Sequence, residues 1–489
     1  MTTPPRTDAE TATPAAAPAA PGVRIPGPRS PEDGPPAARR RDRGPYLLAC
    51  AFFVAYALQS VLRFRRMETL SWDLGIFEQA IRGYAHLQAP IADLKGPGSH
   101  ILGDHFSPVT ALLAPFYRVF PTPVTLLVAQ AALFALAVLP VTRAAGRLLG
   151  RARGTAVGVA FGLSWGVQRA VDFDFHEICF AVPLIAFALE ALLAHRWRAA
   201  LWWALPLVLV KEDLGVTLSA IALLVALRAR RTDPRAAWWA LGAAVFGLAA
   251  ALLVFTVVIP AFNTGGDYGY WDKLASHGPL DGLDTKIRTL LWILVPTTGL
   301  LALRSPLLLV LLPTLGWRFL SGEEHYWSTD WHYNAVLMPV LALALVDAAD
   351  AARRSPRPWL RSYALHAPVA VAAAALALTP HQPLAALTEA PTYRKSERVT
   401  EAEELLARIP DGASVEADVG PIARLVSRCR VFWIGDTRGV VPDWIALNND
   451  SGWAGNPVEY AAKLHPGETF TLFGQASGYV LLKHSGAGG

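Results

Sequence analysis

Long apolar runs recur along most of this 489-residue chain, and they constrain its fold more than any other feature. A water-soluble chain of this length carries about a quarter charged residues, whereas only 17% are charged here and 53% are hydrophobic. This combination predicts a mainly α-helical, polytopic transmembrane bundle. About eleven runs are candidate spans, at residues 46–62, 124–142, 155–171, 179–194, 199–210, 214–227, 236–259, 287–303, 306–316, 333–346 and 364–379.

Several of these runs are shorter than the roughly 20 residues that a straight span needs. We therefore expect their helices to extend into flanking Trp and Tyr residues or to be broken within the protein. The basic residues indicate the orientation. If the N-terminus is cytoplasmic, the short inward loops hold 19 Lys and Arg residues and the outward loops hold 9. The bias predicts a multi-pass plasma-membrane protein with its N-terminus inside and its C-terminus outside.

Charge and cysteine content exclude two classes of function. The arginines behind the net charge of +5 are scattered over short loops rather than gathered on one face, so no nucleic-acid partner is expected. The three cysteines, Cys50, Cys179 and Cys429, are too few and too far apart for a disulfide framework or a thiolate metal site.

The chain divides into three predicted parts. Residues 1–44 are rich in Pro and Ala, lack apolar periodicity, and are expected to form a disordered cytoplasmic tail. Residues 45–380 form the transmembrane helical bundle, whose outer loop 63–123 bears an interfacial or re-entrant helix at 107–120. Residues 381–489 form a small extracytoplasmic α/β domain, with helices at 392–408 and 457–464 and strands at 414–417, 430–434, 444–447, 469–473 and 479–482.

Carboxylates and histidines gather in the outward loops, whereas the inward loops carry little besides arginine. Such groups at so many membrane edges suggest a shared polar cavity. Asp73 opens an amphipathic helix with an apolar face of Leu74, Phe77 and Ile81, and acts either as its cap alone or also as a functional carboxylate. Asp104 and His105 form either a capped turn or part of a metal or phosphate site.

The stretch from Asp172 to Glu177 is a sharper candidate. If it is extended, alternation places Asp172, Asp174 and His176 on one side. They could then ligate a divalent cation or orient a substrate hydroxyl, with Arg169 close by; the alternative is a solvated loop anchored by its aromatic residues.

Two further charged segments lie at outward edges. The tripeptide Lys211, Glu212 and Asp213 forms either a salt-bridged turn or a phosphate site, because charges this close to hydrocarbon are costly unless they are paired or used. Glu324 and His325 belong to an aromatic and acidic stretch that is either an interfacial belt or part of the cavity.

Four of these motifs occur in order in a known family. The Gly-Ile-Phe-Glu-Gln context of Asp73, the Asp-His-Phe-Ser-Pro turn at 104–108, the Phe-Asp-Phe-His loop at 173–176 and the Lys-Glu-Asp turn at 211–213 resemble the membrane-protein family called domain of unknown function 2079. The resemblance covers roughly residues 46–480 and carries no assigned activity.

The layout also resembles the GT-C class of membrane glycosyltransferases. That resemblance implies many helices, an inside N-terminus, a catalytic acid and an interfacial helix in the first outer loop, and an outer C-terminal domain. It also implies a sugar donor carried on polyprenyl phosphate. Asp73 occupies the position of the acid, as a single residue rather than the acidic doublet that many GT-C members carry there.

The leading hypothesis is a transferase that moves a sugar from a polyprenyl-phosphate donor to an acceptor on the outer face, with a membrane lipid as partner. Asp73, Asp174 and His176 are its predicted catalytic residues, and a divalent cation, Mg²⁺ or Mn²⁺, held by Asp174 and His176 is one way to meet the phosphate. The predicted substrate-binding residues are Glu78, Asp104, His105, Arg169, Lys211, Glu212, Asp213, Glu324 and His325.

Two other functions stay open. A transporter or flippase for a lipid-linked or anionic solute would need ionisable groups in the inner half of the bundle, where Glu190 is the main example. A binding or assembly scaffold would leave the clustered acids unexplained. The catalytic hypothesis requires that Asp73, Asp174, His176 and Lys211 face one cavity.

Overall fold

A computed structural model describes residues 1–3, 42–68, 72–266, 278 and 280–486. The predicted tail, 1–44, lies mostly outside the described residues. Residues from Arg43 onward form one compact unit, which holds both the helices and the sheet described below.

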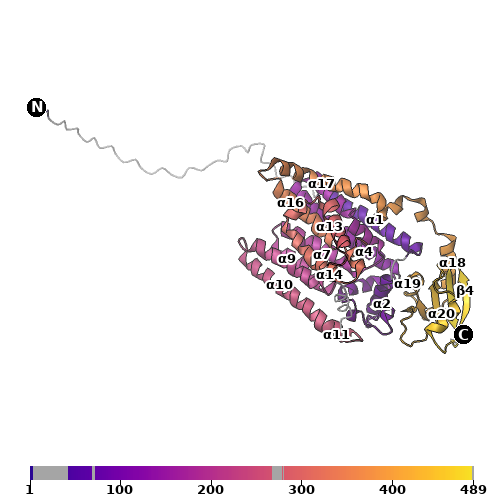
Figure 1. Ribbon diagram of the computed structural model, residues 1–489. Helices are drawn as coiled ribbons and strands as arrows, with labels where there is room; N and C mark the ends of the chain where they lie inside the picture. The colour runs from indigo at the N-terminus through magenta and orange to yellow at the C-terminus, as the bar shows by residue number, and fades with distance from the viewer. Residues whose placement is uncertain (4–41, 69–71, 267–277, 279, 487–489) are drawn as a thin grey trace, which may run out of the picture. The chain divides into compact units, whose positions relative to one another are not determined.

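The unit is mainly helical, as predicted. Its α-helices are α1 (Gly44–Arg65), α2 (Asp73–Ala85), α3 (Ala114–Val119), α4 (Pro123–Leu149), α5 (Arg151–Gly162), α6 (Trp165–Asp172), α7 (Ala181–Leu193), α8 (Trp197–Ala204), α9 (Leu214–Ala229), α10 (Pro234–Leu253), α11 (Ile259–Phe262), α13 (Leu283–Thr298), α14 (Leu312–Leu320), α15 (Glu324–Trp327), α16 (Leu337–Ala352), α17 (Pro358–Leu378), α18 (Glu397–Leu406), α19 (Val419–Leu425) and α20 (Pro457–Leu464) (Figure 1).

Each predicted apolar run coincides with helical structure. Within the described residues, four helical segments are long and apolar enough to cross a membrane: Gly44–Arg65, Pro123–Leu149, Pro234–Phe262 and Pro358–His381. Other runs are broken, as expected for spans of insufficient length. For example, a 3-10 turn, Leu205–Leu209, follows α8, and another, Pro306–Leu311, precedes α14. A membrane-protein fold is therefore confirmed, whereas the number of spans and their orientation stay predictions.

Small residues allow close packing of α9 against α10. A Cβ atom on Gly215 would lie 2.4 Å from the carbonyl oxygen of Gly247, and the reverse substitution would meet the Gly215 carbonyl at the same distance. At this crossing the Ser219 hydroxyl donates a hydrogen bond to the Ala244 carbonyl oxygen at 2.7 Å. Close backbone approach of this kind is a common way for helices to associate in lipid. The lipid tails are themselves apolar, so the burial of apolar side chains between helices contributes little free energy there.

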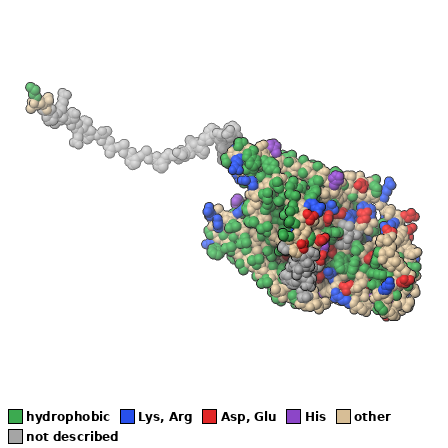
Figure 2. Space-filling model, viewed as in Figure 1, with side chains coloured by type: hydrophobic (Ala, Val, Ile, Leu, Met, Phe, Trp, Pro, Cys, Tyr) green, Lys and Arg blue, Asp and Glu red, His purple; other side chains and the backbone are tan. Residues whose placement is uncertain are grey.

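The outside of the helical part is rich in large apolar side chains. In Figure 2 hydrophobic side chains cover much of this face. The exposed apolar side chains of the helical part include Trp238 and Trp239 on α10, which are 74% and 71% exposed. Exposure on this scale is unfavourable in water and favourable in lipid.

The predicted helix in the first outer loop is present in two pieces, a 3-10 segment at Pro108–Leu113 and α3. Its exposed side is apolar, because Leu112, Phe116, Val119 and Phe120 are all more than 60% exposed. This face suits the surface of a bilayer, although its position in the interface stays a prediction.

The C-terminal part contains a five-stranded sheet in the order β2-β1-β3-β5-β4. The strands are β1 (Ser414–Ala417), β2 (Arg430–Trp433), β3 (Trp444–Asn448), β4 (Phe470–Ala476) and β5 (Tyr479–His484). Strand β1 runs parallel to β2 and β3, whereas β5 is antiparallel to β3 and β4. All five predicted strands are confirmed. The helix predicted from 392 begins later, at Glu397, because the Ser396 hydroxyl caps it by accepting a hydrogen bond from the Val399 N–H.

Helix α2 joins the bundle to the sheet domain. Leu74, Phe77 and Ile81 are buried in the core of the bundle, as predicted. On other sides of the helix, the Gln79 Nε2 donates to the Val431 carbonyl oxygen at 2.8 Å, and Arg82 donates to two carbonyl oxygens at the end of α19 and in the loop that follows. Helix α2 is thus held by both the bundle and the sheet domain.

Candidate functional site

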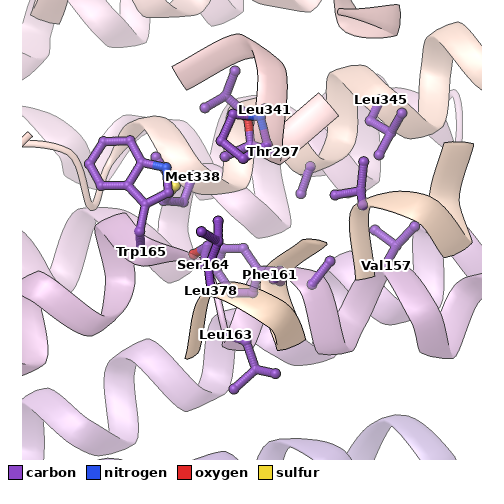
Figure 3. Close-up of a pocket in the computed structure, with 15 residues that line it drawn as sticks. Val157, Phe161, Leu163, Ser164, Trp165, Thr297, Met338, Leu341, Leu345 and Leu378 are labelled. Carbon is purple, nitrogen blue, oxygen red and sulfur yellow. The ribbon is translucent and has the colours of Figure 1, made fainter. Parts of the chain in front are cut away.

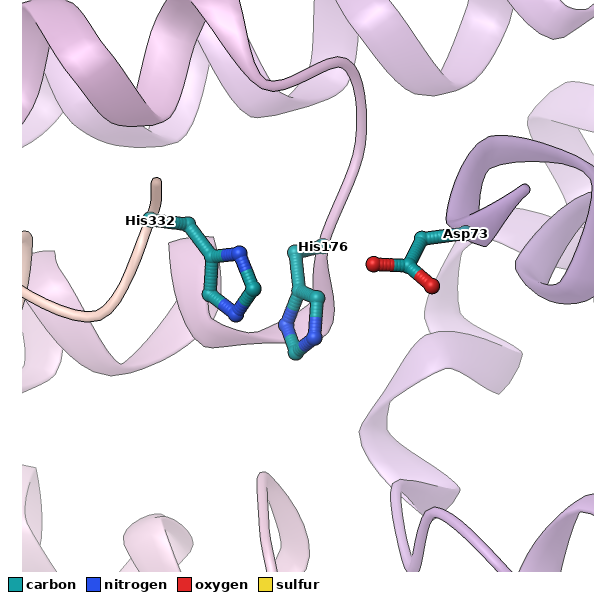
Figure 4. A group of neighbouring side chains, drawn as sticks. All are labelled: Asp73, His176 and His332. Carbon is teal, nitrogen blue, oxygen red and sulfur yellow. The ribbon is translucent and has the colours of Figure 1, made fainter. Parts of the chain in front are cut away.

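Three segments that are far apart in the sequence bring Asp73, His176 and His332 together. Asp73 is the first residue of α2, His176 precedes a 3-10 turn at Glu177–Phe180, and His332 lies in the loop before α16. One ligand atom from each side chain lies within 4.8 Å of those of the other two. Figure 4 shows His176 between the Asp73 carboxylate and the His332 ring. We call these three residues the central group.

His176 is held in one orientation. Its backbone N–H donates to the Gln130 Oε1 at 3.0 Å, and its Nδ1 lies 2.6 Å from the Glu177 Oε2. Because Glu177 contacts Nδ1, the imidazole presents Nε2 on its other side. The ring also packs edge-on against Phe77, with centroids 5.3 Å apart.

Glu177 is fully buried, and its carboxylate contacts the His176 imidazole and the Lys211 ammonium. Its second oxygen accepts a hydrogen bond from the Lys211 ammonium at 2.9 Å. Burial alone would raise the pKa of the Glu177 carboxyl, but His176 and Lys211 outweigh this effect and hold the pKa well below its usual range. Burial would lower the pKa of Lys211, yet Glu177 and Glu212 hold it well above its ordinary value. Both groups are therefore charged at neutral pH.

His332 stacks on His176, with ring centroids 3.7 Å apart, and its ring also packs against those of Tyr333 at 4.2 Å and Phe173 at 4.5 Å. Burial, followed by the proximity of His176, holds the pKa of His332 well below its usual range, so its imidazole is neutral. Among the described residues, the buried Nδ1 of His332 has no hydrogen-bond partner. A neutral nitrogen with an unused lone pair can accept a proton or bind a cation.

The backbone next to both histidines is strained. Trp331, directly before His332, has a φ of +64°, and Asp174, two residues before His176, has a φ of +74°. Such left-handed conformations cost a non-glycine residue about 1–3 kcal/mol and are concentrated at functional sites. Here they turn the two imidazoles toward each other.

A second ionic chain lies beside the central group. The Asp104 carboxylate contacts the His105 Nδ1, and the Lys95 ammonium lies 3.2 Å from the same carboxylate. Burial would raise the pKa of Asp104, but His105 and Lys95 hold it well below its usual range. The His105 ring lies 6.1 Å from that of His176, so the two chains meet at His176.

The structure places the predicted residues of the Lys-Glu-Asp turn near the central group. A cavity of about 20 Å³, enough for one water molecule, is lined by His176, Lys211, Asp213 and His332. Glu212 is buried, and its carboxylate lies 3.8 Å from the Lys211 ammonium. Asp73, His176 and Lys211, together with Asp104 and His105, thus form one connected cluster.

The loop at 172–176 is not extended, so alternation does not apply to it. Asp172 ends α6 and forms an ion pair with Arg63, and the left-handed Asp174 turns the chain. Asp174 is buried, and its carbonyl oxygen accepts a hydrogen bond from the Gln130 amide. Among the described residues, the group whose atoms lie close enough to hold a metal ion is Asp73, His176 and His332, and it does not include Asp174.

Three other predicted residues lie away from the central group. Glu78 is buried and accepts a hydrogen bond from the Tyr117 hydroxyl at 2.8 Å. Glu324 and His325 are exposed on α15, where the His325 ring packs on Tyr326 with centroids 4.4 Å apart.

Arg169 lines a separate polar pocket of about 320 Å³, together with Arg288, Thr289 and Asp330. Its guanidinium lies 3.9 Å from the Asp330 carboxylate, two residues before His332. Trp165 lines this pocket and also an apolar one between α5, α13, α16 and α17, whose walls include Phe161, Met338, Leu341 and Leu378 (Figure 3). A cationic pocket thus adjoins an apolar pocket.

Sequence reasoning missed the roles of His332, Glu177 and Arg288. His332 lies in the aromatic and acidic stretch for which the belt and the cavity both stayed open, and it was not named as a site residue. A histidine between two aromatic residues, two positions after an acidic residue, is the signal that could have singled it out, since a belt needs no imidazole.

The donor set of the central group suits a divalent cation. Two imidazole nitrogens and one carboxylate favour Zn²⁺ or Mn²⁺ over Mg²⁺, which prefers oxygen ligands. The unpartnered Nδ1 of His332 and the carboxylate contact of His176 both fit ligation, because metal-bound histidines usually place their second nitrogen on a carboxylate.

Comparisons with known proteins match most of the chain. A family model described as "Predicted membrane protein (DUF2079)" matches residues 63–464. No curated protein has a significantly similar sequence.

Solved structures show a shared fold. The crystal structure of ArnT from Cupriavidus metallidurans bound to undecaprenyl phosphate is 14% identical, with a TM-score of 0.58 over 90% of this chain and 98% of that chain. ArnT in the apo state is 12% identical, with a TM-score of 0.52 over 89% and 97%. The arabinosyltransferase EmbB from Mycobacterium smegmatis is 15% identical, with a TM-score of 0.33 over 74% and 32%, which is too low to bear on the fold.

The buried Glu78 generates a prediction about pH. Burial raises its pKa from 4.5 to about 8, against the hydrogen bond from Tyr117 and the charge of Arg82. The folded protein therefore keeps this carboxyl protonated, whereas the unfolded chain ionises it, so the free energy of unfolding falls as the pH rises from about 4.5 to 8. Replacing Glu78 by Gln should leave the apparent Tm nearly unchanged at pH 5 and raise it by several degrees at pH 8.

Thermal unfolding of the detergent-purified protein at both pH values measures this effect. Glu404→Gln, at an exposed position of α18, is the control and should shift neither Tm. An equal shift for Glu78→Gln at pH 5 and pH 8 would contradict the prediction.

Proposed function

The chain belongs to the DUF2079 family of predicted membrane proteins and shares the fold of ArnT, and from this premise we propose that it is a GT-C-type glycosyltransferase. The proposed reaction moves a sugar from a polyprenyl-phosphate donor to an acceptor on the outer face of the plasma membrane. The observation that carries the proposal is the convergence of Asp73, His176 and His332 beside a pocket with two arginines.

The polar pocket suits the phosphate of an amphiphilic donor. Arg169 and Arg288 supply guanidinium groups that can bind phosphate oxygens bidentately. The adjoining apolar pocket has a volume of about 30 Å³, which has room for only a water molecule or two, so the isoprene tail would lie in the lipid along the apolar outside of the bundle. ArnT, which shares this fold, was crystallised with undecaprenyl phosphate, and this supports a polyprenyl phosphate as the lipid partner.

Asp73 is the proposed general base. The carboxylate takes the proton of the acceptor hydroxyl while that oxygen forms a bond to C1 of the sugar. The bond between C1 and the phosphate oxygen breaks, and polyprenyl phosphate leaves with the electron pair. Arg169 and Arg288 stabilise the charge that develops on the departing phosphate. Lys211 and Glu177 keep His176 in place and close the inner side of the site.

We propose that Asp73, His176 and His332 also hold a divalent cation. When bound, it would act as a Lewis acid toward the phosphate. A carboxylate has two oxygens, so one can bind a cation while the other takes a proton.

A transport function has less support. Glu190, the main ionisable residue in the inner half of the bundle, lies 2.5 Å from the Arg143 guanidinium and also faces Arg147 and Arg196 at 3.8 and 3.9 Å. This pairing accounts for a buried carboxylate at the end of α7 without a transport path.

The general-base role predicts a large loss of activity on Asp73→Asn. Transfer from a polyprenyl-phosphate-linked sugar in membranes should fall by about 10²- to 10⁴-fold, the usual contribution of general-base catalysis. The measurement is the incorporation of labelled sugar from a panel of such donors, with Glu404→Gln as the control. Wild-type rates for Asp73→Asn would sink the proposal.

The donor site predicts that the phosphate is held by two guanidinium groups. Arg169→Gln and Arg288→Gln should each weaken binding of undecaprenyl phosphate about tenfold, because each removes charge-assisted hydrogen bonds worth roughly 1.5–3 kcal/mol. Native mass spectrometry measures this binding, and undecaprenol, which lacks the phosphate, serves as the comparison ligand. Arg235→Gln, at an exposed position of α10, is the matched control. Equal affinities in all three variants would exclude this pocket.

The cation site predicts metal content. Purified protein should retain about one equivalent of Zn²⁺ or Mn²⁺, and His332→Ala should lose most of it, whereas His325→Ala should retain it. Elemental analysis of the three proteins decides the matter, and equal metal content in all of them would count against the central group as the ligand set.

A further inference from the structure

A cavity outside the helical bundle lies in the C-terminal domain. It has a volume of about 440 Å³, within the range of about 300–1,000 Å³ that is typical of ligand pockets. Two indoles, one carboxylate and one amide line it: Trp433, Trp453, Asp418 and Asn448. The proposed reaction above assigns no role to it.

The cavity lies at the carboxyl ends of three parallel strands of the sheet. Asp418 directly follows β1, Trp433 ends β2 and Asn448 ends β3, and these three strands are parallel. Strand β1 lies between β2 and β3. The chain that follows β1 therefore runs to β2 on one side of it, and the chain that follows β2 runs to β3 on its other side. Ligands of open α/β sheets bind at the carboxyl ends of strands beside such a switch in direction.

The polar groups of the cavity are held firmly. Both Asp418 carboxylate oxygens accept the Asn448 N–H at 3.0 Å, which joins the ends of β1 and β3. The Trp453 indole N–H donates to the Asn448 carbonyl oxygen at 2.9 Å, and its ring is nevertheless 46% exposed. An indole fixed by its nitrogen and exposed over much of its surface is a preformed apolar platform.

The chemistry of the lining selects a neutral, hydroxylated ligand. Of the described residues that line the cavity, Asp418 alone is charged, so an anionic ligand is disfavoured. Aromatic faces pack against the C–H face of a pyranose ring, while a carboxylate and an amide accept and donate hydrogen bonds to its hydroxyls.

The cavity is connected to the central group through two adjacent residues. The Trp433 ring packs on that of Trp72, with centroids 4.4 Å apart, and Trp72 immediately precedes Asp73. We propose that this cavity is the binding site for the saccharide portion of the acceptor, a neutral oligosaccharide. The assignment to an acceptor rests on the proposed function, whereas saccharide binding itself does not.

Binding is tested on the full-length protein in lipid nanodiscs. A printed array of neutral and acidic oligosaccharides identifies ligands, and isothermal titration with the best neutral one gives the affinity. The wild-type protein should bind at least one neutral oligosaccharide, and Trp453→Ala should weaken that binding at least tenfold. Trp453→Phe keeps an aromatic face but loses the indole N–H, so it should stay within about threefold of the wild type.

The matched control is Phe473→Ala, which removes an aromatic side chain of similar exposure, 44%, from β4 of the same domain. It should bind like the wild type, and gel filtration should show all variants folded. Equal binding by Trp453→Ala and the wild type, binding of acidic glycans only, or no binding to any glycan would each overturn the proposal.

The outcomes separate this inference from the proposed function. Saccharide binding that depends on Trp453, in a protein without transferase activity, would retain the site and reject the reaction. Sugar transfer by Trp453→Ala with an unchanged KM for the acceptor would retain the reaction and reject the site.

Discussion

The buried Glu177 carboxylate is the interaction on which the candidate site depends. It is fully enclosed, so its charge is tolerable only because the Lys211 ammonium and the His176 imidazole contact its two oxygens. Those contacts fix three things at once: the loop after α6, the turn before α9 and the orientation of the His176 ring. His332 then stacks on a ring that cannot turn, and the Asp73 carboxylate faces it. Removing the carboxylate would leave an ammonium buried without its counter-charge, which costs several kcal/mol.

The charged side chains around the central group can stay buried because each of those named below has a charged or hydrogen-bonding neighbour. Lys95, Asp104 and His105 form one chain of contacts, and Lys211 and Glu177 form another. The chains approach each other at the His105 and His176 rings. Such pairing allows ionised groups to lie buried in a bundle whose outside is apolar.

The sequence was sufficient for the helices, the five strands and both family resemblances, because lipid exposure and strand alternation leave direct marks on composition. It also pointed to Asp73 and His176, since ionisable residues at membrane edges are rare. It could not reveal that Asp174 adopts a left-handed conformation, which breaks the extended alternation on which the predicted side of Asp172, Asp174 and His176 depends. Glu78 lies five residues after Asp73, so the helix turns it by roughly 140° to another face, where Tyr117 binds it. His332 joins the group only through packing between distant loops, which periodicity does not record.

The sheet domain and the loop at residues 63–123 depend on each other. Strand β2 is an edge of the sheet, and an uncovered edge exposes unpaired backbone groups. Here the Gln79 amide binds the Val431 carbonyl oxygen, and Arg430 forms a two-point ion pair with Asp93, at 2.7 and 3.1 Å. The loop therefore protects the strand, while the strand holds α2 and, through Trp72 and Trp433, the residue that precedes Asp73. If the sheet domain moved, the Asp73 carboxylate would move with it. The position of the proposed base therefore depends on the packing of β2 against α2.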